Sequence, residues 1–167
     1  MKHITIFLDI DGVLATQKQF FMSRKHHNKQ FNCYPFDKGC IEVFNSICDI
    51  IKPNIVLSTD WRLEYSLDDM NKIFKWNNIT HPIIDFTPDL WKKDFHDLSQ
   101  LEECRANEIS KYIEEKQIGD NFLVIDDLDM SPYFDELNFI HTPRVTEGIK
   151  QTGILTKIVM KYKQLQK

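Results

Sequence analysis

Residues 4–14 have the sequence Ile4-Thr5-Ile6-Phe7-Leu8-Asp9-Ile10-Asp11-Gly12-Val13-Leu14, in which two carboxylates and a glycine interrupt a run of β-branched and apolar residues. The apolar part predicts a buried β-strand. Side chains two residues apart in a strand point to the same side, so Asp9 and Asp11 converge on one point. Gly12 lets the chain turn sharply after them. We therefore expect a buried strand that delivers two acids to one site.

Two neighbouring carboxylates repel each other unless a cation or a shared proton offsets the repulsion. A hard cation with oxygen ligands, such as Mg²⁺, is the natural partner. The alternative is an ordinary acidic turn in which Asp9 and Asp11 bind the local backbone. A calcium-binding EF-hand loop fits poorly, because Gly12 comes too early and no glutamate closes the loop at the required spacing.

Two further apolar runs also end in polar side chains. Asn54-Ile55-Val56-Leu57 leads into Ser58-Thr59-Asp60-Trp61-Arg62, and Asn121-Phe122-Leu123-Val124-Ile125 leads into Asp126-Asp127. Hydroxyls and a helix N-terminus suit a phosphate group, although Ser-Thr-Asp by itself also suits a helix cap. In an open parallel sheet the carboxyl ends of the strands lie along one crevice. The recurrence therefore favours a shared site over an isolated acidic turn.

The rest of the chain alternates between helical and extended patterns. We expect helices over about 37–51, 66–76, 105–116 and 154–162, and further strands over about 82–86 and 139–141. This alternation predicts an α/β fold, a Rossmann-like doubly wound parallel sheet with right-handed crossovers. Residues 87–103 have weak periodicity, so we expect a loop there, with His96 as a surface histidine.

Residues 15–38 are predicted to form a short insertion. The segment interleaves cations with aromatic rings: Lys18, Arg24, Lys25, His26, His27 and Lys29 alternate with Phe20, Phe21, Phe31, Tyr34 and Phe36. It could act as a flap whose cations attract phosphates and whose rings stack on a base. The alternative is a solvated surface insertion whose phenylalanines pack on the core.

Composition places the chain among ordinary globular proteins. With 167 residues we expect one domain over 1–167, and a net charge of −4 with 42% hydrophobic residues carries no electrostatic signature of a nucleic-acid binder. The first apolar run is too short to span a membrane and no signal-peptide pattern is present, so we expect a cytoplasmic protein. The four cysteines lack Cys-x-x-Cys spacing and are expected to be free, buried thiols.

Taken in order, these motifs resemble those of the haloacid dehalogenase (HAD) superfamily of phosphohydrolases. Asp9-Ile10-Asp11-Gly12-Val13-Leu14 resembles motif I, Ser58 resembles motif II, and Asp126-Asp127 resembles motif IV. The usual motif III cation is lysine, whereas the best candidate here is Arg105, at the start of the helix before the motif IV strand. The alternatives are Lys92, Lys93 and, less well placed, Lys111. The Ser-Thr-Asp-Trp-Arg segment, the arginine and the double aspartate also resemble small HAD domains associated with nucleic-acid repair.

The resemblance implies a phosphatase mechanism. Asp9 would be the nucleophile that forms an aspartyl-phosphate, and Asp11 would act as general acid and then general base. Mg²⁺ would be held by Asp9, by the backbone carbonyl of Asp11, and by Asp127 with or without Asp126. Ser58, Thr59 and Arg105 would hold the phosphoryl oxygens.

The resemblance also directs the substrate prediction. No large cap domain fits into so short a chain, so we expect an open site and a macromolecular phosphate end, contacted by Trp61, Arg62 and the 15–38 insertion. A phosphatase for polynucleotide 3′- or 5′-ends is the first hypothesis. The alternatives are a nucleotide monophosphatase and a non-catalytic binding module that kept the fold. Oligomeric state is left open.

Overall fold

The computed structural model describes residues 3–90 and 97–167 of the chain. Its centre is a five-stranded, all-parallel sheet with the strand order β3-β2-β1-β4-β5. The strands are β1 (Thr5–Leu8), β2 (Asn54–Leu57), β3 (Ile83–Phe86), β4 (Phe122–Asp126) and β5 (Phe139–His141). The predicted α/β fold with a doubly wound parallel sheet is therefore confirmed.

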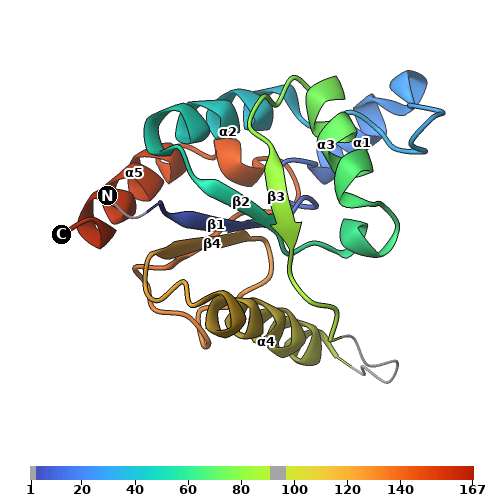
Figure 1. The fold of residues 1–167 in the computed structure, drawn as a ribbon. Coiled ribbons are helices and arrows are strands. Elements are labelled where there is room, and N and C mark those ends of the chain that lie inside the picture. The colour runs from blue at the N-terminus through green and yellow to red at the C-terminus, as the bar shows by residue number, and fades with distance from the viewer. Residues whose placement is uncertain (1–2, 91–96) are drawn as a thin grey trace.

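Helices cover both faces of the sheet (Figure 1). One face carries α2 (Lys38–Ile51), α3 (Leu67–Trp76) and α5 (Ile154–Leu165), and the other carries α4 (Leu98–Lys116). Within the described ranges, no helix has the length and apolar character needed to cross a membrane.

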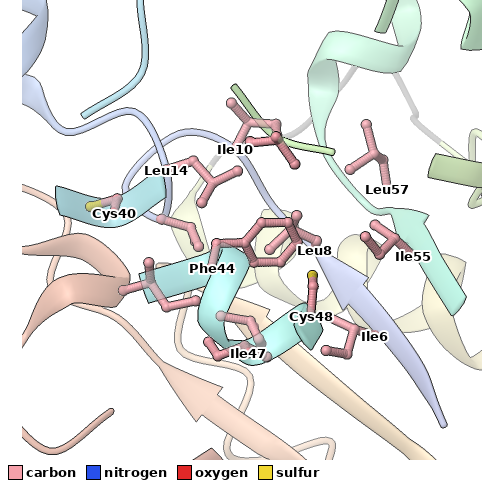
Figure 2. Packing of buried hydrophobic residues seen from close by; sticks show 14 of the residues in the cluster. Ile6, Leu8, Ile10, Leu14, Cys40, Phe44, Ile47, Cys48, Ile55 and Leu57 are labelled. Carbon is pink, nitrogen blue, oxygen red and sulfur yellow. The ribbon is translucent and has the colours of Figure 1, made fainter. Parts of the chain in front are cut away.

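The two-residue period of β1 builds both halves of the core. Ile6 and Leu8 pack in the cluster beneath α2, whereas Phe7 points to the opposite face and packs against α4. Figure 2 shows Phe44 of α2 lying over the sheet among the aliphatic side chains of the first cluster. Because every strand residue of β1 is buried, the acids that follow it start from a fixed backbone.

Two of the expected helix starts are confirmed by their caps. The Asp37 carboxylate accepts hydrogen bonds from the backbone N–H groups of Gly39 and Cys40, at the beginning of α2. Ser66 accepts from the N–H of Asp69 and donates its hydroxyl to the Asp69 carboxylate at the beginning of α3. These short-range signals were readable from the sequence.

The helix before β4 begins earlier than predicted. It starts at Leu98 instead of Arg105, with the Asp97 side chain accepting from the N–H of Gln100, so residues 98–103 are helical and not loop. The buried residues of α4 begin at Cys104, so residues 98–103 lack the buried apolar stripe on which the prediction relied. His96, predicted as a surface histidine, and Lys92 and Lys93, the alternatives for the motif III cation, lie outside the described residues.

The insertion at 15–38 is made of short elements. It contains α1 (Gln17–Met22), a 3₁₀ turn (Arg24–His26) and an isolated antiparallel bridge between Asn28 and Cys33. The Tyr65 hydroxyl donates a 2.6 Å hydrogen bond to the backbone carbonyl of Phe31, which ties the insertion to the segment before α3. The four cysteines are free and buried, as expected.

Candidate active site

Three adjacent strands bring polar residues to one edge of the sheet. Asp9 follows β1, Ser58 follows β2, and Asp126 ends β4. The backbones of Asp9 and Ser58 are held by extensions of the parallel ladder: the N–H of Asp9 donates to the carbonyl of Ile125 at 3.0 Å, and that of Ser58 donates to the carbonyl of Leu8 at 3.0 Å. Asp126 lies within the ladder, paired with His141 of β5. The sheet therefore fixes the positions from which these side chains project.

An acid cluster lies at this edge, formed by Asp9, Asp126 and Asp127. One carboxylate oxygen from each residue lies within 4.8 Å of the others. Asp9 is only 5% exposed and Asp126 is fully buried. Several carboxylate oxygens gathered in a buried place are the donor set that a hard divalent cation takes, so the residues fit a metal site. The Asp11 side chain is not part of this cluster.

Arg105 partly balances the charge of the acid cluster. Its Nη1 atom donates to Asp9 Oδ1 and to Asp126 Oδ2, both at 3.2 Å, and its Nη2 atom donates to Asp60 Oδ1 at 2.9 Å. The side chain is buried. Arg105 lies inside α4, not at its start as predicted, and its guanidinium contacts Asp9 and Asp126. Lys111 is exposed and pairs with Glu115.

Burial and mutual repulsion raise the proton affinity of the acid cluster. Burial, followed by the charge of Asp126, raises the pKa of Asp9 well above its usual range, and Arg105 opposes that rise. Burial raises the pKa of Asp126 to about 6, again against the effect of Arg105. Although burial opposes it, the surrounding carboxylates raise the pKa of Arg105. One guanidinium thus leaves negative charge in excess, which a cation would neutralise.

Asp11 lies apart from the acid cluster and reaches the surface. Its Oδ2 atom accepts a 2.9 Å hydrogen bond from Trp61 Nε1. Desolvation raises the pKa of Asp11, while Trp61 and Arg144 oppose the rise. A carboxyl group that is more easily protonated than usual and open to solvent is suited to proton transfer.

Gly12 allows the motif I turn to approach Asp127 closely. Its φ is +75°, and a Cβ atom built there would lie 2.5 Å from both Cγ and Oδ2 of Asp127. Any side chain at position 12 would therefore displace Asp127 from the acid cluster. This steric conflict explains why glycine follows the two aspartates of Asp-x-Asp-Gly.

Two buried hydroxyls beside Asp9 lack partners. Ser58 Oγ and Thr59 Oγ1 form no hydrogen bond with any residue that the structure describes, although both residues are fully buried. Leaving a buried polar group unpaired costs about 1–3 kcal/mol. Such groups are suited to bind the oxygens of an anion at the same edge of the sheet.

The structure does not place Arg62 where a substrate contact was expected. Its side chain is 4% exposed; its Nη2 atom lies 2.6 Å from Glu108 Oε1, and its Nη1 atom donates to the carbonyl of Thr59 at 2.7 Å. The buried Glu108 attracts the Arg62 side chain inward, and Arg62 in turn stabilises the turn that carries Thr59. Trp61, the other predicted contact, is partly exposed and lines a surface pocket beside Asp11.

Sequence reasoning missed three charged residues at this site. Asp60 and Glu108 contact Arg105, and Arg144 Nε lies 2.8 Å from Asp127 Oδ2. The last pair does not have hydrogen-bond geometry, since Asp127 Oδ2 forms no hydrogen bond with a described residue. The spacing of Glu108 three residues after Arg105 on a helix could have suggested their contact. Arg144 lies in a loop after β5, and no local pattern marks it.

The parallel sheet with the order 3-2-1-4-5 and acids at the ends of β1 and β4 is consistent with the core of the HAD class. Residues 5–152 match the family described as "HAD domain in Swiss Army Knife RNA repair proteins". The chain belongs to this family. No curated protein and no solved structure gives a significant match to it.

Proposed function

We propose that this protein is a Mg²⁺-dependent phosphomonoester hydrolase that acts on nucleic-acid ends through an aspartyl-phosphate intermediate. The observation that carries the proposal is the acid cluster with Ser58 and Thr59 hydroxyls unpaired at the same edge of the sheet. Membership of a family named for RNA repair proteins supports a nucleic-acid substrate over a free metabolite.

Asp9 is the proposed nucleophile. One of its carboxylate oxygens forms a bond to phosphorus as the bond to the ester oxygen breaks, and the departing oxygen takes a proton from Asp11. A water molecule then gives a proton to Asp11 and attacks the aspartyl-phosphate, which releases inorganic phosphate and restores Asp9. The raised pKa of Asp11 supports this exchange, and such acid–base help typically contributes about 10²–10⁴ in rate.

The proposed metal ligands are Asp9, Asp126, Asp127 and the backbone carbonyl of Asp11. When bound, Mg²⁺ would neutralise charge between the nucleophile and the phosphate. In the same proposal Ser58 and Thr59 donate hydrogen bonds to the phosphoryl oxygens, and Arg105 orients Asp9 while adding positive charge nearby. The 3.2 Å contact between Arg105 and Asp9 supports that orienting role.

The test is phosphate release in the presence of Mg²⁺. The substrates are RNA and DNA oligonucleotides with a 5′- or 3′-phosphate, a panel of mononucleotides, and glycerol phosphate as a non-aromatic monoester. Asp9→Asn is the inactive variant. Asp135→Asn is the matched control, because Asp135 is an exposed acid outside the acid cluster.

We expect hydrolysis of oligonucleotide ends, at least a 10³-fold loss in Asp9→Asn, and unchanged rates in Asp135→Asn. Preference for mononucleotides would overturn the substrate assignment and favour a nucleotide monophosphatase. Binding of Mg²⁺ without hydrolysis of any substrate, or full activity in Asp9→Asn, would overturn the enzymatic assignment.

A further inference from the structure

A pocket with aromatic walls opens directly beside Asp11. Its volume is about 680 Å³, within the range of small-molecule sites. The insertion supplies Phe20, Phe21 and Tyr34, and the turn after β2 supplies Trp61 and Tyr65. We call this space the aromatic pocket and define it by those five rings. Because Asp11 also lines it, a group held there would lie next to the site of phosphate chemistry.

The walls of the aromatic pocket are held by contacts that do not need a ligand. Trp61 and Tyr65 lie with ring centroids 5.5 Å apart and planes 31° apart, and Phe20 meets Tyr34 edge-on at 4.9 Å. The hydrogen bond from the Tyr65 hydroxyl to the carbonyl of Phe31 ties the insertion to the turn after β2. The hydrogen bond from Trp61 Nε1 to Asp11 then couples one wall to the proposed proton donor.

The charges around the aromatic pocket argue against a second phosphate group. Among the described residues that line it, Arg144 is the sole lysine or arginine, and it lies against Asp127. Asp11, Asp60 and Glu64 also line the pocket and would repel a further anion. A flat, neutral group with polar edges suits this environment better, because rings can stack on it.

We propose that the aromatic pocket holds the base of the terminal nucleotide whose phosphate is removed. The inference rests on the proposed function, since it uses the acid cluster to place the phosphate. Unstacked bases at nucleic-acid ends are commonly bound on aromatic side chains, and the pocket provides five rings beside the proposed site of reaction. The insertion thus binds the terminal nucleoside by stacking its aromatic rings on the base, and its cations are not the main contact with the substrate.

The first test compares two versions of one RNA oligonucleotide with a terminal phosphate, one carrying the terminal base and one abasic at that nucleotide. Both are assayed for kcat/KM, and their binding to Asp9→Asn is measured by titration. The pocket variant is Phe20→Ala, because Phe20 is 45% exposed and its loss leaves the core intact. Tyr133→Ala is the matched control, with a 42% exposed ring that does not line the aromatic pocket.

We expect the base-containing end to be preferred by about 5- to 150-fold, the value of one aromatic stack. Phe20→Ala should reduce this preference by lowering kcat/KM for the base-containing end, with little change in kcat/KM for the abasic end. Tyr133→Ala should behave as wild type. The preference should also be similar at 50 and 200 mM salt, because stacking of a neutral base releases no counterions.

Equal rates and equal binding for the two ends would overturn the inference, as would an equal loss on both substrates in Phe20→Ala. The titration of Asp9→Asn with the two oligonucleotides separates this outcome from failure of the proposed function. If nothing is hydrolysed yet Asp9→Asn binds the base-containing end preferentially, the pocket assignment stands and the phosphatase assignment falls. If both ends are hydrolysed equally, the phosphatase assignment stands and the pocket assignment falls.

Discussion

A single guanidinium organises the charges of the site. Arg105 contacts Asp9, Asp126 and Asp60 through its terminal nitrogens, and its Nε atom lies 3.8 Å from Glu108. The planar fork of arginine can reach several carboxylates at once, which the point charge of lysine cannot. Removing the cation would leave buried carboxylates facing one another.

We expect Arg105→Met to lower the free energy of unfolding of the metal-free protein by about 3–5 kcal/mol at pH 7.5, the usual cost of breaking a buried ion pair from one side. Arg105→Lys should fall between this variant and wild type. Urea denaturation measures both. Lys111→Met on the exposed side of the same helix is the control, with an expected change within about 0.5 kcal/mol. Equal stability of Arg105→Met and Lys111→Met would contradict the assignment.

Gly12 offers a second test at the scale of one residue. We expect Gly12→Ala to lose both stability and Mg²⁺ affinity, because its Cβ atom would press on Asp127 in addition to straining a backbone at φ +75°. Gly119→Ala separates the two effects: its φ is +67°, but no atom lies within 4 Å of the added Cβ. The control should lose only about 1–2 kcal/mol, and its Mg²⁺ affinity by calorimetry should be unchanged. Matching affinities in the two variants would show that Asp127 does not depend on the glycine.

At the scale of elements, Asp37 joins three separate segments. Its carboxylate caps α2, accepts from the Thr16 hydroxyl at 3.3 Å, and pairs with Lys150. Thr16 in turn caps α1, which carries Phe20 into the aromatic pocket. The start of the insertion, the main core helix and the segment before α5 therefore meet at one side chain.

We expect Asp37→Ala to lower the free energy of unfolding by about 1–3 kcal/mol, more than the loss of a simple helix cap, because two further contacts disappear. Ser66→Ala, which removes the cap of α3, should cost about 1 kcal/mol. Thermal unfolding measures the difference, and hydrogen exchange should show faster exchange in α1 for Asp37→Ala alone. A smaller loss of unfolding free energy in Asp37→Ala than in Ser66→Ala would contradict the role of Asp37 in joining the three segments.

The elements that sequence reasoning identified correctly are those with uninterrupted local patterns. The runs before Asp9, Ser58 and Asp126 could be predicted as strands because burial on both faces of a parallel sheet requires continuous apolar residues. The start of α4 was predicted wrongly because residues 98–103 carry no buried side chain, so no apolar stripe marks the first turns of this helix. Which side chain meets which across the sheet depends on long-range contacts.

That limit also applies to the candidate site. Arginine side chains usually lie at the surface, and only the ion pair with Glu108 explains why the side chain of Arg62 is buried. Arg144 meets Asp127 through the loop after β5, which no spacing in the sequence reveals. The proposed roles of Asp9, Asp11 and the hydroxyl residues remain predictions for the experiments above.

For the whole molecule, the acid cluster links stability to pH and to metal. The pKa of Asp126 is raised from 3.8 to about 6 in the folded protein. Between these values the folded state binds more protons than the unfolded state, so the free energy of unfolding falls as the pH rises. The stabilising contribution is fully present below about pH 4 and is lost above about pH 6.

We therefore expect metal-free protein to melt at a lower temperature at pH 7.5 than at pH 5, by a few degrees. Added Mg²⁺ should raise the melting temperature more at pH 7.5, because protons compete with the cation at pH 5. Asp126→Asn should reduce both effects, because it removes one of the titrating carboxylates of the cluster, and Asp135→Asn should retain them in full. A melting temperature that rises from pH 5 to pH 7.5 without metal would contradict this account.

The position of β1 between β2 and β4 has a consequence for how the protein is made. Asp9 is synthesised well before its backbone partner Ile125 and its neighbour Asp126, because β2, β3 and the helices α1 to α4 lie between β1 and β4 in the chain. A nascent or prematurely terminated chain that lacks β4 therefore holds an incomplete set of acids and no acid cluster. Because formation of the cluster waits for these long-range contacts, an unfinished chain would lack the site on which the proposed phosphatase activity depends.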